Sequence, residues 1–209
     1  MIGVIDYDAG NIRSVLNALG WVGAPARLIE RTAEMEECRG LVLPGVGAFR
    51  SAMDELEARG LADGLRDWAA QRRRPLLGVC AGMQLLAARG VEGGDAGGLG
   101  LIEAAVLRIT PAPPARVPHI GWNEVVRRRD ATLWGPLDRA YCYFAHSFAM
   151  TFDDDGERER WVVGETDHDG GIVAMVEHEN IMGAQFHPEK SQKHGLAILK
   201  HFVEAAEKW

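Results

Sequence analysis

The sequence predicts a single α/β domain with a mostly parallel sheet, helices on both sheet faces and antiparallel strands added in the C-terminal half. In the first 90 or so residues, short apolar runs alternate with segments whose apolar residues recur every three or four positions, which is a β-α-β-α-β-α-β-α order. The second half is rich in short β-prone runs separated by Gly and Asn, which predicts the antiparallel additions. A length of 209 residues suits one domain that spans residues 1–209.

In the first half, four buried strands are expected at residues 1–5, 26–29 and 40–43 and in the apolar run that ends at Cys80. Helices are expected at residues 11–19, 49–59 and 61–71, with a helical turn at 34–38. Gly20 stands where a helix C-cap would, and Asn11 suits an N-cap.

The second half begins with a Gly-rich segment, residues 90–100, which we expect to be a flexible surface loop. Strands are expected at residues 101–109, 161–165, 172–177 and 181–186 and around the β-prone run 141–144, and a closing amphipathic helix at 195–208. The remaining segments are expected to be an extended Pro-rich connector at 110–118, a loop at 119–123 and a charged hairpin or loop at 153–160. Trp122 in that loop is either a binding anchor or a residue that closes an edge of the core.

Composition excludes several classes of function. The net charge of −7 argues against nucleic-acid binding, which needs a basic face, and the short basic runs at residues 72–74 and 127–129 are typical of solvated surfaces. The three cysteines are widely spaced and form no C-x-x-C pair, so neither a disulfide framework nor a structural metal site is expected, and no organic cofactor is indicated. The absence of a disulfide framework fits a reducing cytoplasm, so we expect a cytoplasmic protein. No membrane contact is expected, because no apolar run reaches the length of a membrane span.

Residues 75–86 have the pattern of a nucleophile elbow, with Cys80 in the place of the usual serine. An apolar run turns sharply between Gly78 and Gly82 and continues as a helix-like run at residues 83–89. Free backbone N–H groups at the start of that run would favour a thiolate and a developing oxyanion. Taken by itself, the pattern is equally compatible with a buried structural cysteine.

The loop after the third strand, residues 44–47, carries Gly45 and Gly47, whereas a plain β-to-α turn would need no more than one glycine. Two glycines allow the backbone to approach a ligand closely and to direct N–H groups at it. Sites in parallel α/β sheets form outside the carboxyl ends of the strands, and both this loop and Cys80 lie there. The sequence therefore predicts one site that contains both.

The last short strand leads into His187, Pro188 and Glu189. In extended backbone, His187 and Glu189 project to the same side. A cysteine nucleophile needs a base and a group that orients the base, and this pair supplies both. His119 and His146 remain competing bases, and a surface histidine beside a solvated acid is the alternative for the pair.

Two of these motifs, residues 78–84 and 186–189, resemble the class I (triad) glutamine amidotransferases, which have a flavodoxin-like α/β domain. Residues 5–11, 44–49, 119–123, 144–148 and 187–191 make the chain similar, within that superfamily, to the glutaminase subunits of imidazole glycerol phosphate synthase. The resemblance extends from the first strand to the last helix. It departs from the common pattern at Ala81, where Leu is frequent, and at Phe148, where Tyr is commoner.

The resemblance implies a role for each matching residue. It implies a catalytic Cys80–His187–Glu189 triad that hydrolyses glutamine, and ammonia transfer within a heterodimer to a (β/α)₈ cyclase of histidine biosynthesis. It also implies oxyanion contacts from the backbone of Gly45, Val46, Gly47 and Ala81, glutamine contacts from Gln84, His146, Ser147 and Phe148, and partner contacts from Asn11, Trp122 and Lys190. A peptide flip between Gly45 and Gly47 would be the switch by which the partner controls the oxyanion site.

Three alternatives to this interpretation have different consequences. Another glutaminase, such as a paralogue serving a surface-sugar amidotransferase, would keep the triad and not respond to the cyclase. A stand-alone cysteine hydrolase or peptidase would not need glutamine. A non-catalytic interaction subunit would not need Cys80, His187 and Glu189, which are all present.

Overall fold

The larger of two sheets has nine strands and is parallel in one half and antiparallel in the other. The computed structural model describes residues 1–209. In spatial order the strands are β2 (Ala26–Ile29), β1 (Ile2–Ile5), β3 (Gly40–Gly45), β4 (Leu76–Cys80), β13 (Ile181–Ala184), β12 (Gly171–His178), β11 (Val162–Asp167), β8 (His119–Arg127) and β9 (Arg139–His146). The first five run parallel and the remaining pairs antiparallel, which confirms the predicted fold class.

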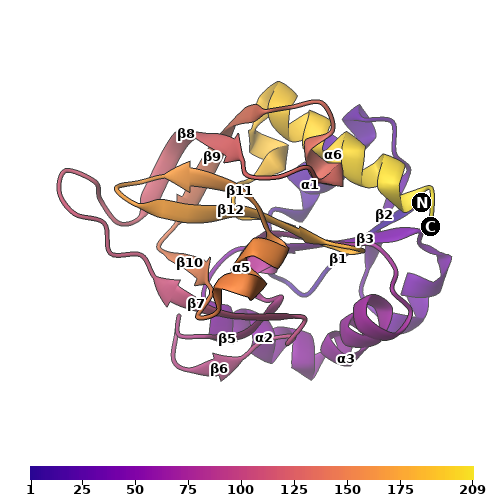
Figure 1. Ribbon diagram of the computed structural model, residues 1–209. Helices are drawn as coiled ribbons and strands as arrows, with labels where there is room; N and C mark the ends of the chain where they lie inside the picture. Colours follow the sequence, from indigo (N-terminus) through magenta and orange to yellow (C-terminus); the bar gives the residue numbers. More distant parts are fainter.

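Helices cover both faces of this sheet (Figure 1). On one face lie α1 (Ile12–Trp21) and α6 (Gln192–Ala206), and on the other lie α2 (Phe49–Ala58) and α3 (Leu61–Arg66). The buried apolar side chains accordingly form two clusters, one of 31 residues that includes those of α2 and α3 and one of 28 that includes those of α1 and α6. Parallel strands buried from both sides appear in the sequence as continuous apolar runs, which is why β1, β3 and β4 are identifiable from sequence.

A second, four-stranded sheet lies beside α2 (Figure 1), and the sequence did not indicate it as a separate sheet. Its order is β10 (Phe148–Thr151), β7 (Ile102–Arg108), β5 (Ala87–Gly90) and β6 (Ala96–Gly97). The helix expected at residues 83–89 is therefore wrong, since α4 spans only Ala81–Gln84 and β5 follows. The chain leaves the helix because the carbonyl of Leu85 accepts a hydrogen bond from the N–H of Leu99, and the carbonyl of Leu86 accepts from those of Leu101 and Ile102. The Gly-rich segment expected to be a loop contains β6, which pairs with β5.

Three other expectations are corrected. Residues 119–123 form the start of β8 rather than a loop, because each pairs with a residue of β9. Residues 153–160 contain a helix, α5 (Asp155–Trp161), whose first turn is capped by the Asp154 carboxylate accepting from the Glu157 N–H at 2.8 Å. The first helix does not end at Gly20, the expected C-cap, but continues to Trp21. The glycine with a left-handed φ beyond its end is Gly23, at 79°.

The short helical turns complete the element list. They are η1 (Thr32–Glu37), η2 (Asp67–Gln71), η3 (Thr132–Trp134) and η4 (Pro188–Lys190). The last of these replaces the extended backbone expected between His187 and Glu189. None of the helices combines the length and the apolar character that a membrane crossing requires.

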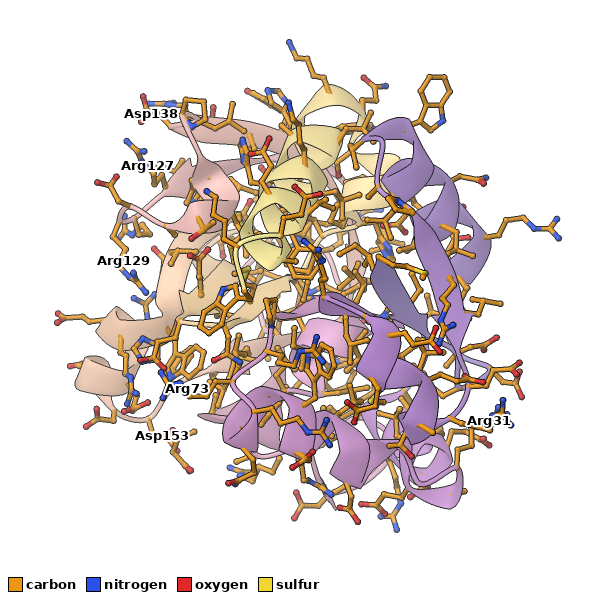
Figure 2. The ribbon with its side chains drawn as sticks, turned by 90° about the vertical axis from the view of Figure 1, so that its right-hand side faces the viewer. Arg31, Arg73, Arg127, Arg129, Asp138 and Asp153 are labelled. Atoms are coloured by element: carbon orange, nitrogen blue, oxygen red, sulfur yellow. The ribbon has the colours of Figure 1, made fainter.

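Residues of the two basic runs interact with carboxylates or main-chain carbonyls of the same chain. Arg73 pairs with Glu179, Arg127 pairs with Asp138, and Arg129 donates to the main-chain carbonyls of Arg160 and Glu177 at 2.6 Å. Figure 2 shows Arg127 near its partner Asp138 at the outer edge of the molecule.

Candidate active site

Three adjacent parallel strands bring the predicted site residues together. In the sheet, β4 lies between β3 and β13, with Gly45 opposite Cys80 and Ala184 opposite Val79. The loop at residues 44–47, the turn at Cys80 and the segment after β13 therefore leave the sheet at the same carboxyl edge. The predicted convergence of these three segments is present in the fold.

Cys80 sits on a strained turn between β4 and α4. Its φ is 55° and its ψ −115°, a conformation that costs a non-glycine residue of order 1–3 kcal/mol. The turn is possible because Gly82 passes close to β3, where an added Cβ would lie 1.8 Å from the carbonyl oxygen of Leu43. This geometry is that of a nucleophile elbow, which presents the side chain at the end of the sheet.

Cys80 opens into a cavity of about 370 Å³. Eight of the residues predicted to form the site line it together with Cys80: Val46, Gly47, Ala81, Gln84, His146, Ser147, Phe148 and His187. Lys190, predicted as a partner contact, also reaches it. The volume suits a ligand of the size of a free amino acid.

His187 and Glu189 form a buried pair beside Cys80. The His187 Nδ1 lies 2.9 Å from the Glu189 Oε1, and their side chains are 4% and 1% exposed. Burial alone would lower the pKa of His187, but hydrogen bonds to Cys80 and to Glu189 outweigh it and raise that pKa to about 9. The other oxygen of Glu189, Oε2, is buried without a hydrogen-bond partner in the chain, so this carboxylate depends on His187.

The backbone of His187 is held in place by the neighbouring strand β9. Its N–H donates to the carbonyl of Tyr143 at 2.9 Å, and its own carbonyl accepts from the Ser191 hydroxyl at 2.6 Å. Ser191 in turn accepts from the N–H of Tyr143 at 2.9 Å. These bonds fix the imidazole toward Cys80.

Neither competing histidine is available as the base. Both ring nitrogens of His146 are engaged, Nδ1 with the Phe148 carbonyl at 2.8 Å and Nε2 with the His119 Nδ1 at 3.0 Å. Burial lowers the pKa of His146 to about 4 and that of His119 to about 3. Both rings are therefore neutral near pH 7, and His119 does not line the cavity.

The loop at residues 44–47 presents unpaired N–H groups beside Cys80. The N–H groups of Val46 and Gly47 form no hydrogen bond within the chain, and Gly47 has a left-handed φ of 89°. The loop is tied down at its start by Tyr7, a buried residue that the sequence did not indicate, whose hydroxyl donates to the carbonyl of Pro44 at 2.8 Å. Gly45 packs against the backbone of the elbow, where an added Cβ would lie 2.4 Å from the N of Gly82.

Gln185 is a second site residue that the sequence analysis missed. Its Nε2 lies 4.0 Å from the Cys80 Sγ, and its Oε1 accepts from the Gln84 Nε2 at 3.1 Å. Gln84 also donates to the Phe148 carbonyl at 2.8 Å. The position of Gln185 could have been inferred, since it directly follows a strand whose carboxyl end meets that of β4.

The three predicted partner residues lie on different elements. Trp122 is 49% exposed on β8, and the Lys190 Nζ lies 5.8 Å from the ring centre of Tyr143. Asn11 precedes α1 at the N-cap position, but its side chain forms no capping hydrogen bond. All three are accessible to a partner at least in part.

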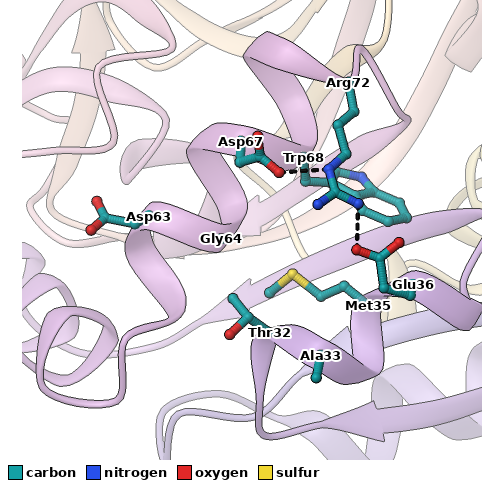
Figure 3. Close-up of a pocket in the computed structure, with 9 residues that line it drawn as sticks. All are labelled: Thr32, Ala33, Met35, Glu36, Asp63, Gly64, Asp67, Trp68 and Arg72. Carbon is teal, nitrogen blue, oxygen red and sulfur yellow. Dashed lines mark hydrogen bonds and ion pairs between the residues drawn. The ribbon is translucent and has the colours of Figure 1, made fainter.

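Another cavity, of about 400 Å³, lies between η1 and α3 (Figure 3). Arg72 crosses it and pairs with Asp67 and Glu36. Its lining contains no cysteine, serine or histidine. Nowhere in the chain do three or more His, Cys, Asp or Glu side chains gather in a way that could hold a metal ion.

Comparisons with known proteins agree with this geometry. The family model for class-I glutamine amidotransferases matches residues 3–206, so the chain belongs to that family. A solved structure of a glutamine amidotransferase, 21% identical, matches with a TM-score of 0.77 over 99% of this chain and 98% of the other, which shows the shared fold.

Within the family, the chain belongs with the HisH subunits of imidazole glycerol phosphate synthase. The HisH subunit of Geobacillus thermodenitrificans is 42% identical, over 97% of this chain and 95% of that protein. The HisH subunit of Streptococcus gordonii is 43% identical, over 98% of this chain and 96% of that protein. These findings confirm the resemblance inferred from the motifs.

Proposed function

We propose that the chain is the glutaminase subunit of an imidazole glycerol phosphate synthase, and that residues 1–209 act as one cytoplasmic domain. One observation carries the proposal: Cys80, strained on its elbow, shares its cavity with a buried His187 whose ring is paired with Glu189. That arrangement supplies a nucleophile, a base and an orienting acid. The HisH relatives support the choice of pathway.

In this mechanism the Cys80 sulfur attacks the carboxamide carbon of glutamine. His187 accepts the thiol proton and then gives it to the departing ammonia, while Glu189 orients the ring. A His187 pKa of about 9 means that the imidazole retains this proton near neutral pH, which suits its second task as an acid. Water then hydrolyses the glutamyl thioester, with His187 as base, and releases glutamate.

The negative charge that develops on the glutamine carbonyl oxygen requires backbone N–H donors. The unpaired N–H groups of Val46 and Gly47, in the loop that begins at Gly45, and the N–H of Ala81 at the elbow are the donors. Removing one such donor typically lowers the rate roughly 10²–10³-fold. Rotation of the peptides beside Gly45 and Gly47 would supply or withdraw a donor, which makes this loop the switch for activation by a partner.

The α-amino and carboxylate groups of glutamine are held by the far wall of the cavity, made of His146, Ser147 and Phe148. The side-chain amide of Gln84 already donates to the Phe148 carbonyl, so Gln84 acts by fixing that wall. Phe148 fills the position where related chains more often have Tyr.

The product ammonia passes to a (β/α)₈ cyclase, with which the chain forms a heterodimer that makes imidazole glycerol phosphate and an aminoimidazole carboxamide ribotide. The outer face of the β8–β9 ribbon supports a docking role, because Ile120, Trp122 and Tyr141 are 62%, 49% and 54% exposed. Lys190 links this face to the cavity, and Asn11 completes the set of proposed contacts.

The first test is glutamate release from glutamine by the purified chain, alone and with the cyclase and its nucleotide ligand. We expect strong stimulation by the liganded cyclase, and a loss of roughly 10⁴-fold or more in the Cys80→Ala variant. High activity alone with no response to the cyclase would favour a glutaminase of another amidotransferase, such as the surface-sugar paralogue. No glutamate under any condition would overturn the proposal.

The docking face is tested by Trp122→Ala, with Trp21→Ala as the matched control. Trp21 is 82% exposed, at the end of α1, and is not among the proposed contacts. A buried interface tryptophan contributes about 2 kcal/mol or more, so Trp122→Ala should weaken cyclase binding roughly 30-fold in a titration. Equal binding by the two variants would place the interface elsewhere.

A further inference from the structure

A chain of hydrogen bonds runs from the half-buried Asn123 through the buried rings of His119 and His146 to the wall of the cavity. The Asn123 Nδ2 donates to the carbonyl of Asp167 at 2.7 Å and lies 3.2 Å from the His119 Nε2. The His119 Nδ1 lies 3.0 Å from the His146 Nε2, and the His146 Nδ1 lies 2.8 Å from the Phe148 carbonyl oxygen. We call Asn123, His119 and His146 the relay.

The direction of every bond in the relay is determined by its two ends. The Asn123 Oδ1 accepts from the N–H of Glu124 at 2.8 Å, so its amide nitrogen must face Asp167 and His119. His119 therefore accepts at Nε2 and donates from Nδ1, and His146 accepts at Nε2 and donates from Nδ1 to Phe148. All donors and acceptors are matched when both imidazoles are neutral.

The relay ends on a group that shapes the proposed glutamine pocket. The Phe148 carbonyl accepts from both His146 and Gln84, the second bond at 2.8 Å. Ser147 and Phe148 line the cavity with Cys80. A carbonyl fixed by two donors fixes the orientation of the neighbouring peptides, which in the proposed function face the α-amino and carboxylate groups of glutamine.

We propose that His119 and Asn123, which do not line the cavity, are positioning residues for glutamine binding: acting through His146, they hold the Phe148 carbonyl and with it the pocket wall. This inference rests on the proposed function. It also gives a role to the His119 ring itself, which is stacked between Phe144 and His168 at centroid distances of 4.6 and 4.1 Å. The ring cannot rotate out of the relay without breaking both stacks.

The substitution Asn123→Asp tests the direction of the relay. It removes the donor that faces His119 while keeping the size and the Oδ1 atom. At lower pH the introduced carboxylate and the His119 ring share one additional proton, and in that state the relay still donates toward Phe148. When that proton is lost at higher pH, His119 donates to the carboxylate instead, and His146 must donate to His119, which leaves the Phe148 carbonyl without its imidazole donor.

The measurement is KM and kcat for glutamine in the complex with the cyclase, from about pH 6 to about pH 9. The ratio of variant to wild-type KM should be near one at the acid end and rise to roughly tenfold at the alkaline end, as expected for one lost buried hydrogen bond. Taking the ratio at each pH cancels the titration of the triad. The charged or titratable neighbours of the two rings are His168, stacked on His119, and His187, near His146, and both remain in the variant.

Two further variants serve as controls. Asn123→Ala removes the donor and leaves no acceptor, so the direction of the remaining bonds is unchanged. Its KM should exceed the wild-type KM only slightly, and by the same factor at every pH. His168→Phe keeps the stack on His119 and touches no relay bond, so its KM ratio should be near one. The kcat of all three at saturating glutamine should stay within about twofold of wild type.

A flat ratio for Asn123→Asp, equal to that of Asn123→Ala, would overturn the relay and leave Asn123 with a purely structural role. A fall in kcat with unchanged KM would also overturn it, because the relay acts on substrate binding. If the wild-type complex itself released no glutamate, the proposed function would fail instead, so the two failures are distinguishable. Thermal unfolding of each variant shows whether it folds.

Discussion

Tyr7 lies just beyond the end of β1, fully buried, and its hydroxyl donates to the Pro44 carbonyl that begins the loop at residues 44–47. Burial and the nearby Cys80 raise its pKa, so it stays a neutral donor at any working pH. Removal of this hydroxyl would leave the Pro44 carbonyl buried without a partner and would loosen the loop. Tyr7 therefore acts on the proposed reaction without contact with glutamine.

We predict that Tyr7→Phe lowers the free energy of unfolding by about 1–2 kcal/mol. It should also lower kcat for glutamine hydrolysis at least about tenfold, because the Val46 and Gly47 N–H groups lose their alignment. Urea denaturation and glutamate release at saturating glutamine measure the two effects. Tyr141→Phe, which removes an exposed hydroxyl with no hydrogen bond in the chain, should leave stability unchanged. A stable Tyr7→Phe variant with full kcat would contradict the anchoring role.

At this scale, sequence predicted the residues whose chemistry is carried by a local motif. Cys80 stands between glycines, and His187 and Glu189 are two positions apart, so they could be proposed as site residues without knowing the sheet order. Tyr7 and Gln185 were missed because their roles depend on which strands are neighbours. Only the pairing of β1 with β3 and of β13 with β4 brings them to the site.

Among the elements, the elbow between β4 and α4 places the strongest demand on residue type. Gly82 has the carbonyl of Leu43 only 1.8 Å from the position of an added Cβ, and that carbonyl belongs to the backbone of a central strand. Neither the helix nor the strand can move without breaking the sheet pairing of β3 with β4. The same close approach is what places the loop at residues 44–47 beside Cys80.

We predict that Gly82→Ala destabilises the protein by about 3 kcal/mol or more, because the overpacked contact is with backbone that cannot shift. Gly97→Ala is the matched control, since an added Cβ there meets nothing within 4 Å and the residue has an ordinary φ. Urea denaturation of the two variants measures the difference. Similar stabilities would mean that the elbow relaxes far more easily than its packing indicates.

The elements that sequence predicted correctly are those whose pattern is local. The parallel strands appear as continuous apolar runs. The helix expected at 83–89 became β5 because Leu99, Leu101 and Ile102 donate to the carbonyls of Leu85 and Leu86. Residues 119–123 looked like a loop because their strand is defined by β9, more distant along the chain. Helix α5 was missed although Asp154 and Glu157 have the spacing of a capping box.

For the whole molecule, the buried histidines set opposite limits on the pH range of stability. His119 and His146 are buried as neutral rings, with pKa values lowered to about 3 and about 4 from an unfolded value of about 6.5. Their contribution is complete above pH 6.5 or so and is lost as the pH falls, since the unfolded chain binds protons that the folded chain does not. His187 has the opposite sign, because its pKa is raised to about 9. Its contribution is complete below about pH 6.5 and is lost as the pH rises through about 9.

We therefore predict that the free energy of unfolding is greatest near about pH 6.5 and falls on both sides. Each histidine contributes up to about 1.4 kcal/mol per pH unit within its own window. Equilibrium unfolding in urea between about pH 5 and about pH 9 measures the curve, with carboxylate titration largely confined to lower pH. His119→Phe keeps the stack on Phe144 and should reduce the fall in the free energy of unfolding on the acid side only. His187→Asn keeps a donor for Glu189 and should reduce that fall on the alkaline side only. An acid side unchanged by His119→Phe would mean that this ring is not buried in its neutral form, and the relay that depends on its tautomer would then fail as well.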